Sequence, residues 1–281
     1  MNYFYWLFSE RDERIDGYRP EPQYLPCFSN FISEYVQKYG EYLDSEESWK
    51  PEYLDVVSTD KKFRMDDYEG GYRTFNEFFT RRIKKGKRPI GEGVVAPVDG
   101  QVQNVHRIEN GKVDAKIKST VYHDVYKLLQ KEFNSGTLIS MFLDIFDYHR
   151  IHAPVDMKIM SVNKIPGGNY VGGYVEHING KYVFDSSDYG WQSIETRVVI
   201  EARDLAYERV FVVPVGMSHV GSIEMLCKTG DVIKKGDEIG TFKFGGSCVI
   251  MIFEKKELSR IEGKHYLMGE TLVKDFKKNL Q

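Results

Sequence analysis

Residues 230–253 read GDVIKKGDEIGTFKFGGSCVIMIF, and this stretch decides the fold. Two Gly-Asp pairs, at 230–231 and 236–237, flank an apolar Val-Ile pair, which is typical of tight turns between short strands. Residues 249–253 are apolar and rich in β-branched and aromatic side chains, so they predict a buried strand. The stretch therefore predicts a compact β-sandwich or barrel, with the Gly-Gly-Ser of residues 245–247 between two strand-like segments.

The same β-rich texture extends back to about residue 94. Residues 113–117, VDAKI, alternate apolar and polar side chains as a half-buried strand does. Residues 121–133 predict a short helix instead. Further runs of β-branched and aromatic residues predict strands at 137–146, 196–201 and 208–215.

The first ninety residues have a different pattern. Residues 28–43, FSNFISEYVQKYGEYL, place apolar side chains at helical spacing. Thr74 is placed to cap a second short helix over residues 75–83, with Glu77 three positions after it. We therefore expect an α+β fold in which residues 1–90 form a helical region and residues 91–281 a β-dominated mixed sheet or sandwich.

Composition and net charge exclude only a few broad classes of protein. The 281 residues are 41% hydrophobic and 29% charged, which is ordinary for a globular domain, and the net charge of −3 gives no general attraction for nucleic acid. No apolar run approaches the roughly 20 residues that cross a bilayer. Residues 1–8 lack the features of a secretory signal, and either dock on the fold or anchor shallowly in a membrane interface. These features predict a cytoplasmic chain.

Three segments carry the residues suited to catalysis. Asp99 lies in VAPVDG, His149 and His152 lie in DYHRIHAP, and Ser247 lies in FGGSC. A carboxylate that orients an imidazole, and an imidazole that takes a proton from a hydroxyl, are the parts of an activated serine. Each segment also has a structural explanation, as a turn, a surface histidine pair or a bend.

The tetrapeptide Ala-Pro-Val-Asp occurs twice, at 96–99 and at 153–156. Proline limits each copy to an edge, a strand start or a turn. The repeat is either a recurring turn or a pair of related β-elements. In the second case it would bring Asp99 and the histidine segment to one site.

Five segments taken together resemble a known family. FNEFFTR (75–81), APVDG (96–100), DYHRIHAPV (147–155), VGSI (220–223) and KGDEIGTFKFGGS (235–247) are similar, in this order, to the signature segments of the phosphatidylserine decarboxylase family. The resemblance covers residues 75–254, so residues 91–281 are expected to form the catalytic domain.

The resemblance implies a self-processing, pyruvoyl-dependent enzyme without a metal. Cleavage between Gly246 and Ser247 would give fragments 1–246 and 247–281, with Ser247 converted to a pyruvoyl group that accepts electrons as carbon dioxide leaves. His152 would be the base for Ser247 and Asp99 would orient it, while His149 would supply a proton during turnover. Cys248 follows the serine where the family commonly has threonine or serine, and we expect cleavage to survive this difference.

The resemblance also implies a substrate and a partner surface. Phosphatidylserine, which would be converted to phosphatidylethanolamine, would require the protein to reach a membrane interface. The protein could do so as a monomer or as a homodimer. A basic run could attract anionic headgroups, unless it is simply a solvated face. It comprises Arg81, Arg82, Lys84, Lys85, Lys87 and Arg88.

Two alternatives to a lipid decarboxylase stay open. A soluble relative could decarboxylate free aromatic amino acids, with residues 163–189 and the Ser218-His219 pair shaping its pocket. More remotely, the chain could be a non-catalytic β-sandwich binding module or a Ser-His-Asp hydrolase, and both of these predict an uncut chain of 281 residues.

Overall fold

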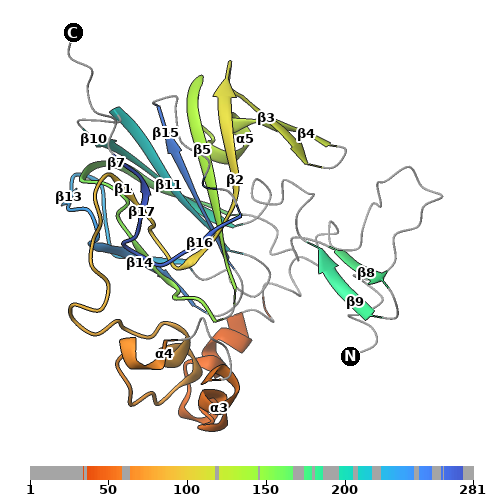
Figure 1. The fold of residues 1–281 in the computed structure, drawn as a ribbon, viewed down its shortest axis with the longest axis vertical. Coiled ribbons are helices and arrows are strands. Elements are labelled where there is room, and N and C mark those ends of the chain that lie inside the picture. Colours follow the sequence, from red (N-terminus) through yellow and green to blue (C-terminus); the bar gives the residue numbers. More distant parts are fainter. Residues whose placement is uncertain are drawn as a thin grey trace.

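The computed structural model describes most of residues 34–274. It covers residues 34, 37–58, 64–117, 120–144, 146–166, 174–178, 181–185, 196–204, 208–216, 223–243, 247–254, 261 and 263–274. Only the backbone is described for residues 56–58, 114–117, 120–124, 174–178, 181–185 and 247. A β body forms most of this structure, and a layer of short helices lies against one end of it (Figure 1).

A ten-stranded sheet forms the centre of the body, and all its described pairings are antiparallel. Strand β16 (His265–Tyr266) pairs with β2 beside the main path. The order across the sheet is β13 (Val232–Ile233), β7 (Met157–Ile165), β10 (Arg197–Asp204), β11 (Glu208–Gly216), β15 (Ser247–Phe253), β5 (Ser135–Leu143), β2 (Gly100–Glu109), β3 (Lys112–Ile117) and β4 (Thr120–Asp124).

Smaller sheets complete the body. A three-stranded sheet contains β12 (Ile223–Met225), β14 (Glu238–Phe242) and β6 (Arg150–His152). Strand β1 (Val94–Val95) pairs with β17 (Thr271–Val273), and β8 (Tyr174–Ile178) pairs with β9 (Lys181–Asp185). The predicted α+β fold with a β-dominated body is confirmed.

The central strands are buried on both faces. In β11, Val210 and Val212 belong to one buried cluster, whereas Phe211 and Val213 belong to another. This alternation follows from the two-residue repeat of a strand. The first cluster is covered by residues of the smaller sheets, and the second includes the buried face of α5 (Val125–Leu129). This layering accounts for the apolar runs in the sequence.

The predicted Gly-Asp turns are confirmed. Gly230 and Gly236 have φ angles of 95° and 87°, a region that favours glycine. In each turn the following aspartate closes the loop, since the Asp231 carboxylate accepts from Lys228 N and that of Asp237 from Lys234 N, both at 3.0 Å. Strand β13 lies between the two turns, at the edge of the sheet.

The helical layer is built from short elements and aromatic side chains. Its elements are the 3-10 helices η2 (Glu46–Ser48) and η3 (Met65–Asp67) and the helices α3 (Glu52–Ser58) and α4 (Phe75–Phe79). Thr74 caps α4 as predicted, because its hydroxyl accepts from Glu77 N at 3.1 Å. Within the predicted helix 28–43, residues 34 and 37–43 are helical, and residues 28–33 lie outside the described part. Rings in mutual contact are those of Trp49, Tyr53, Tyr72, Phe75 and Phe78.

Three predicted elements were wrong in extent. Residues 120–124 form β4 rather than helix, because they pair with β3, and only α5 of the predicted helix 121–133 is helical. The helix predicted over 75–83 ends at Phe79, since Ile83 instead forms a bridge with Tyr68. Strand β5 ends at Leu143, three residues before the predicted end.

The division at residue 90 stays a prediction. Contacts do join the two parts, since the Arg81 guanidinium donates to the carbonyl oxygens of Phe146 and Asp147. Within the described ranges, every helix is too short or too polar to reach across a bilayer. Residues 1–8, with their alternative roles, lie outside the described part.

Candidate functional site

The two Ala-Pro-Val-Asp segments lie side by side. Val95 N donates to Pro154 O at 3.0 Å, and His152 N donates to Pro97 O at 2.8 Å. These two bonds have the register of an antiparallel pair. The arrangement supports the interpretation of the repeat as two related β-elements, because it sets the backbone of Asp99 beside that of the histidine segment.

Asp99 is buried among partners from three segments. Its carboxylate accepts from Met268 N at 2.6 Å, from the Arg88 guanidinium at 3.3 Å and from the Tyr68 hydroxyl at 3.5 Å. Burial raises the pKa of this carboxyl, and the charge of Arg88 and the bond from Met268 N oppose that rise. The next residue is Gly100, where a Cβ atom would come within 2.6 Å of the Phe142 carbonyl oxygen.

His152 has both ring nitrogens engaged. Nδ1 lies 2.7 Å from Gly236 O, and Nε2 lies 3.0 Å from the Tyr148 hydroxyl. Because a carbonyl only accepts, Nδ1 carries the hydrogen and Nε2 accepts from Tyr148. Burial lowers the pKa of His152 below its usual value, and burial raises that of Tyr148, so both groups stay neutral.

The hydrogen bond predicted between Asp99 and His152 is not among those of the described residues. The group that orients the His152 ring is the Gly236 carbonyl, at the tip of the second Gly-Asp turn. The Asp99 carboxylate instead connects Arg88, Tyr68 and the backbone at Met268. The catalytic roles assigned to Asp99 and His152 stay predictions.

His149 is fully buried and has one ring nitrogen without a hydrogen-bond partner in the described structure. Its Nδ1 lies 2.8 Å from Asp147 O, so Nδ1 donates, while Nε2 is the nitrogen without a partner. The Phe79 ring packs against it, with 3.8 Å between the ring centroids. Burial, and then the charge of Arg81, hold the pKa of His149 well below its usual value. His149 is therefore neutral, with an unprotonated Nε2.

Ser247 begins β15. Its backbone lies between those of Leu143 and Gly216 in the sheet. Leu143 is the last residue of β5, and the chain turns from there toward His149. The side chain of Ser247 and residues 245–246 lie outside the described part, so the predicted cleavage site stays a prediction.

Cys248 is not suited to replace the serine as the nucleophile. Its thiol is fully buried, 3.3 Å from the Ser140 hydroxyl. Burial raises the pKa of this thiol to about 12, so it remains protonated at neutral pH, and the thiolate is the reactive form.

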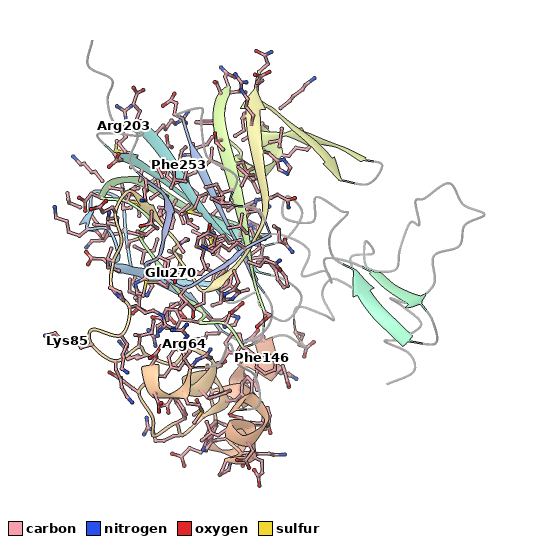
Figure 2. The ribbon with its side chains drawn as sticks, viewed as in Figure 1. Arg64, Lys85, Phe146, Arg203, Phe253 and Glu270 are labelled. Carbon is pink, nitrogen blue, oxygen red and sulfur yellow. The ribbon has the colours of Figure 1, made fainter. Side chains whose placement is uncertain are left out.

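The basic run is divided by the fold, which corrects the predicted six-residue patch. Arg81 is 1% exposed, and Arg88 is buried in an ion pair with Asp67 and Asp99. Both guanidinium groups therefore point into the molecule. The exposed members of the run are Arg82, Lys84, Lys85 and Lys87. Figure 2 shows Lys85 on a loop at the outer edge of the molecule.

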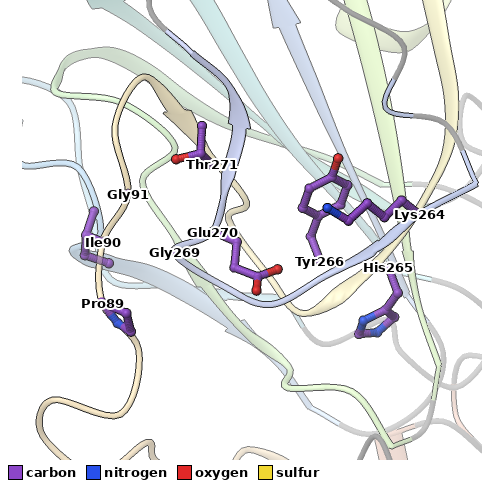
Figure 3. Close-up of a pocket in the computed structure, with 9 residues that line it drawn as sticks. All are labelled: Pro89, Ile90, Gly91, Lys264, His265, Tyr266, Gly269, Glu270 and Thr271. Carbon is purple, nitrogen blue, oxygen red and sulfur yellow. The ribbon is translucent and has the colours of Figure 1, made fainter.

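A hollow of 470 Å³ lies beside the segment that follows residue 263. Its lining includes Ile90, Lys264, His265 and Glu270, and none of the predicted catalytic residues. Figure 3 shows His265 and Tyr266 directed to opposite sides of β16. His265 Nε2 lies 2.7 Å from the Asp147 carboxylate, so the wall of the hollow contacts the turn that carries His149.

The sequence pattern did not indicate the groups that hold the histidines, which are Arg81, Tyr148 and the Gly236 carbonyl. Tyr148 stood in the quoted histidine motif, and Arg81 closed the quoted FNEFFTR segment. Both signals were therefore present as motif positions. The partners of Arg81 and of the Gly236 carbonyl were not evident, because these bonds join residues 66 and 84 positions apart.

Known proteins resemble this chain over the region that contains the candidate site. The family model described as phosphatidylserine decarboxylase matches residues 75–274. The chain is 33% identical over 243 residues to phosphatidylserine decarboxylase proenzyme 2 of Oryza sativa subsp. japonica, covering 80% of this chain and 37% of that protein. It is 30% identical over 240 residues to a phosphatidylserine decarboxylase proenzyme of Fusobacterium nucleatum, covering 81% of this chain and 75% of the relative.

A further proenzyme of the same name, from Brevibacillus brevis, is 32% identical over 233 residues, covering 72% of this chain and 79% of the relative. The chain thus spans about three quarters of these bacterial relatives and little more than a third of the rice protein. The matched region contains Asp99, the turn that carries His149 (called the histidine turn below) and Ser247. The chain belongs to the phosphatidylserine decarboxylase family.

Proposed function

We propose that this protein is a self-processing decarboxylase that converts phosphatidylserine to phosphatidylethanolamine and carbon dioxide. The observation that carries the proposal is His149, a buried neutral histidine whose Nε2 has no partner among the described residues. A buried imidazole with one free nitrogen can take up and deliver a proton at a defined place. The family membership connects that capacity to decarboxylation.

Maturation begins with Ser247 in this proposal. Its hydroxyl attacks the Gly246 carbonyl, the peptide bond breaks as an ester forms, and His152 Nε2 takes the hydroxyl proton. Because the Tyr148 hydroxyl donates to that nitrogen, it has to turn away or relay the proton. Loss of the α-proton then breaks the Cβ–O bond and frees the carboxylate of Gly246. Water replaces the nitrogen of residue 247, which leaves as ammonia, so a pyruvoyl group heads the fragment 247–281.

The described residues fit a pyruvoyl group at position 247. Gly216, which has no side chain, is one backbone neighbour of this residue, and Leu143, the other, ends the strand that leads into the histidine turn. His149 offers the unpartnered polar atom in that turn. When present, the group supplies an electron-withdrawing carbonyl that stabilises the carbanion left by carbon dioxide.

His149 moves the proton that decarboxylation consumes. The reaction replaces the carboxylate on the α-carbon with a hydrogen, so one proton has to arrive from outside. Nδ1 keeps its hydrogen bond to the Asp147 carbonyl, and Nε2 is the atom that binds the proton and transfers it to the substrate. A lowered pKa makes the protonated ring a stronger acid, which favours its transfer to carbon.

The four exposed cations, Arg82, Lys84, Lys85 and Lys87, give this proposal a lipid-facing surface. Each cation near an anionic bilayer contributes about 1 kcal/mol of attraction. Two of them have local partners, because Lys84 Nζ donates to Asp66 O at 3.1 Å and Lys87 lies 3.7 Å from Asp67. Arg82 and Lys85 are therefore the better candidates for headgroup contact. The protein would act at the membrane as a peripheral enzyme.

The test has two steps. Intact-mass spectrometry of the purified protein should find fragments 1–246 and 247–281, the second without a free amino group, and Ser247→Ala should stay whole. Cys248→Thr is the matched control at the next position and should be cut. An uncut wild-type chain would remove the self-processing mechanism and favour the binding-module or hydrolase alternatives.

Carbon dioxide release is then measured from phosphatidylserine in mixed micelles and from free amino acids. We expect release from the lipid by the cut protein and none by Ser247→Ala. Release confined to free aromatic amino acids would keep the mechanism and overturn the lipid substrate.

A further inference from the structure

Arg81 is a buried cation beside the histidine turn. It follows α4 and is 1% exposed. Its Nη2 donates to Phe146 O at 2.5 Å and to Asp147 O at 2.7 Å. The guanidinium also stacks over the Tyr68 ring, 4.5 Å from the ring centroid. These contacts tie one end of the helical layer to two consecutive carbonyl groups of the turn.

The Asp147 carbonyl connects Arg81 to His149. The same oxygen accepts from Arg81 Nη2 and from His149 Nδ1, which fills both of its lone pairs. A carbonyl oxygen only accepts, so His149 keeps its hydrogen on Nδ1 as long as Arg81 holds this carbonyl in place beside the ring. The second nitrogen of the ring, Nε2, is thereby left unprotonated.

The surroundings of His149 reinforce this arrangement. Phe79, two residues before Arg81, packs against the ring in a tilted arrangement, so residues 79–81 contact both the histidine and its turn. The Asp147 carboxylate points elsewhere, because it accepts from His265 Nε2 and from Asp144 N. Arg81 is the charged group that acts on His149, and it disfavours a second proton on the ring.

We propose that Arg81 is a positioning residue for the decarboxylation step: through the shared Asp147 carbonyl it fixes His149 as the Nδ1–H tautomer and leaves Nε2 free to carry the proton. This inference rests on the proposed function and names a residue through which His149 acts. It differs from a purely structural role, in which Arg81 would only satisfy buried carbonyl groups.

The first experiment compares Arg81→Lys with Arg64→Lys. Lysine keeps the charge but lacks the planar fork that reaches both carbonyls. We expect Arg81→Lys to be cut between residues 246 and 247 at near the wild-type extent, with kcat lower by roughly 10- to 100-fold and KM changed less than about threefold. Arg64 is exposed and lies in the same helical layer, so Arg64→Lys should match the wild type in both steps.

A structural role predicts another result. Thermal stability, cleavage and kcat would then fall together in Arg81→Lys, or all three would stay unchanged, and either outcome would overturn the proposal. Arg81→Gln, which keeps an amide donor without the charge, is measured in parallel. Restoration of kcat by Gln would show that donation to the carbonyls, rather than charge, is what positions His149.

A second readout does not depend on activity. Nitrogen-15 NMR of histidine-labelled protein reports the tautomer of each imidazole, and His149→Gln assigns the signal. The wild type, and the uncut Ser247→Ala protein, should show the Nδ1–H form of His149. An Nε2–H form in both would refute the positioning, even if lipid decarboxylation is found. Conversely, an Nδ1–H form in a protein that releases no carbon dioxide would keep the positioning and reject the proposed function.

Discussion

The helical layer and the β body each hold one histidine, and they do so by different means. From the layer, the Phe79 ring packs against His149 and Arg81 binds the carbonyl to which His149 donates, while Nε2 has no partner among the described residues. In the body, the backbone of a tight turn at Gly236 holds His152, and Tyr148 occupies its other nitrogen. Of two histidines three residues apart, one thus has a ring nitrogen without a described partner, and the other has both ring nitrogens hydrogen-bonded.

The difference teaches how one short motif can serve two steps. His152 lies in a strand and is fixed by backbone pairing, because β6 pairs with β14. The turn that precedes β14 also binds the His152 ring through the Gly236 carbonyl. His149 precedes the strand and depends on side chains brought from elsewhere. We therefore expect changes in the layer to affect turnover, and changes in the body to affect folding and maturation.

The largest expected effects come from the histidines themselves. His152→Gln should leave the chain whole, since it removes the base proposed for Ser247. His149→Gln should be cut normally and lose roughly 100- to 10,000-fold in kcat, the usual worth of a proton-transfer group. Gel electrophoresis and a carbon dioxide assay separate the two results. A folded His149→Gln protein that stays uncut would break the comparison.

Two apolar substitutions test the regions at a distance from the proton transfers. Ile139 is fully buried in the body, and Ile139→Ala should lower the free energy of unfolding by about 2 to 5 kcal/mol, with kcat per cut molecule unchanged. Phe79→Leu should cost about 1 kcal/mol or less. It should nevertheless lower kcat roughly tenfold, because the ring packed against His149 is lost. The comparison is contradicted if denaturant unfolding shows the larger loss of stability in Phe79→Leu and steady-state kinetics show the larger loss of kcat in Ile139→Ala.

The pH dependence of stability should carry the signature of both histidines. Each has a pKa in the folded state below its usual value, because burial disfavours the charged ring. Below about pH 6.5 the unfolded chain binds protons that the folded chain does not, so stability falls as pH is lowered, by about 1.4 kcal/mol per pH unit for each histidine. The raised pKa of Asp99, caused by burial, acts in the opposite sense.

Urea unfolding between pH 5 and 7 measures that slope. His149→Gln should make this slope shallower, because it removes the contribution of His149. An identical slope in the wild type and in His149→Gln would mean that His149 is not held neutral by the fold.

The smallest expected effect lies at the surface. Lys85→Gln should weaken binding to vesicles that contain anionic lipid by roughly fivefold, the equivalent of about 1 kcal/mol. Lys112→Gln, at an exposed position of β3, should leave binding unchanged. Arg88→Gln should destabilise the fold instead, because Arg88 is paired with Asp67 and Asp99 inside the molecule. Vesicle sedimentation at two salt concentrations checks the first two, and denaturant unfolding checks the third.

The sequence by itself determined the elements with strong local signals. The Gly-Asp turns at 230–237 follow from the backbone that glycine allows, and the cap at Thr74 from a side chain that reaches three residues along the chain. The strands β11 and β15 follow from long apolar runs, at residues 210–215 and 248–253. The motif order also identified the family, and with it Asp99, His149, His152 and Ser247 as the residues to examine.

Only the tertiary structure decided which charges face inward and which groups hold the histidines. Residues 81–88 read as one basic run, yet Arg81 and Arg88 are buried and their neighbours are exposed, because burial depends on distant partners such as Asp99 and the Asp147 carbonyl. Residues 121–124 became a strand for the same reason, since β3 offered them pairing. Local pattern determines what a segment can form, and long-range hydrogen bonds select among those forms.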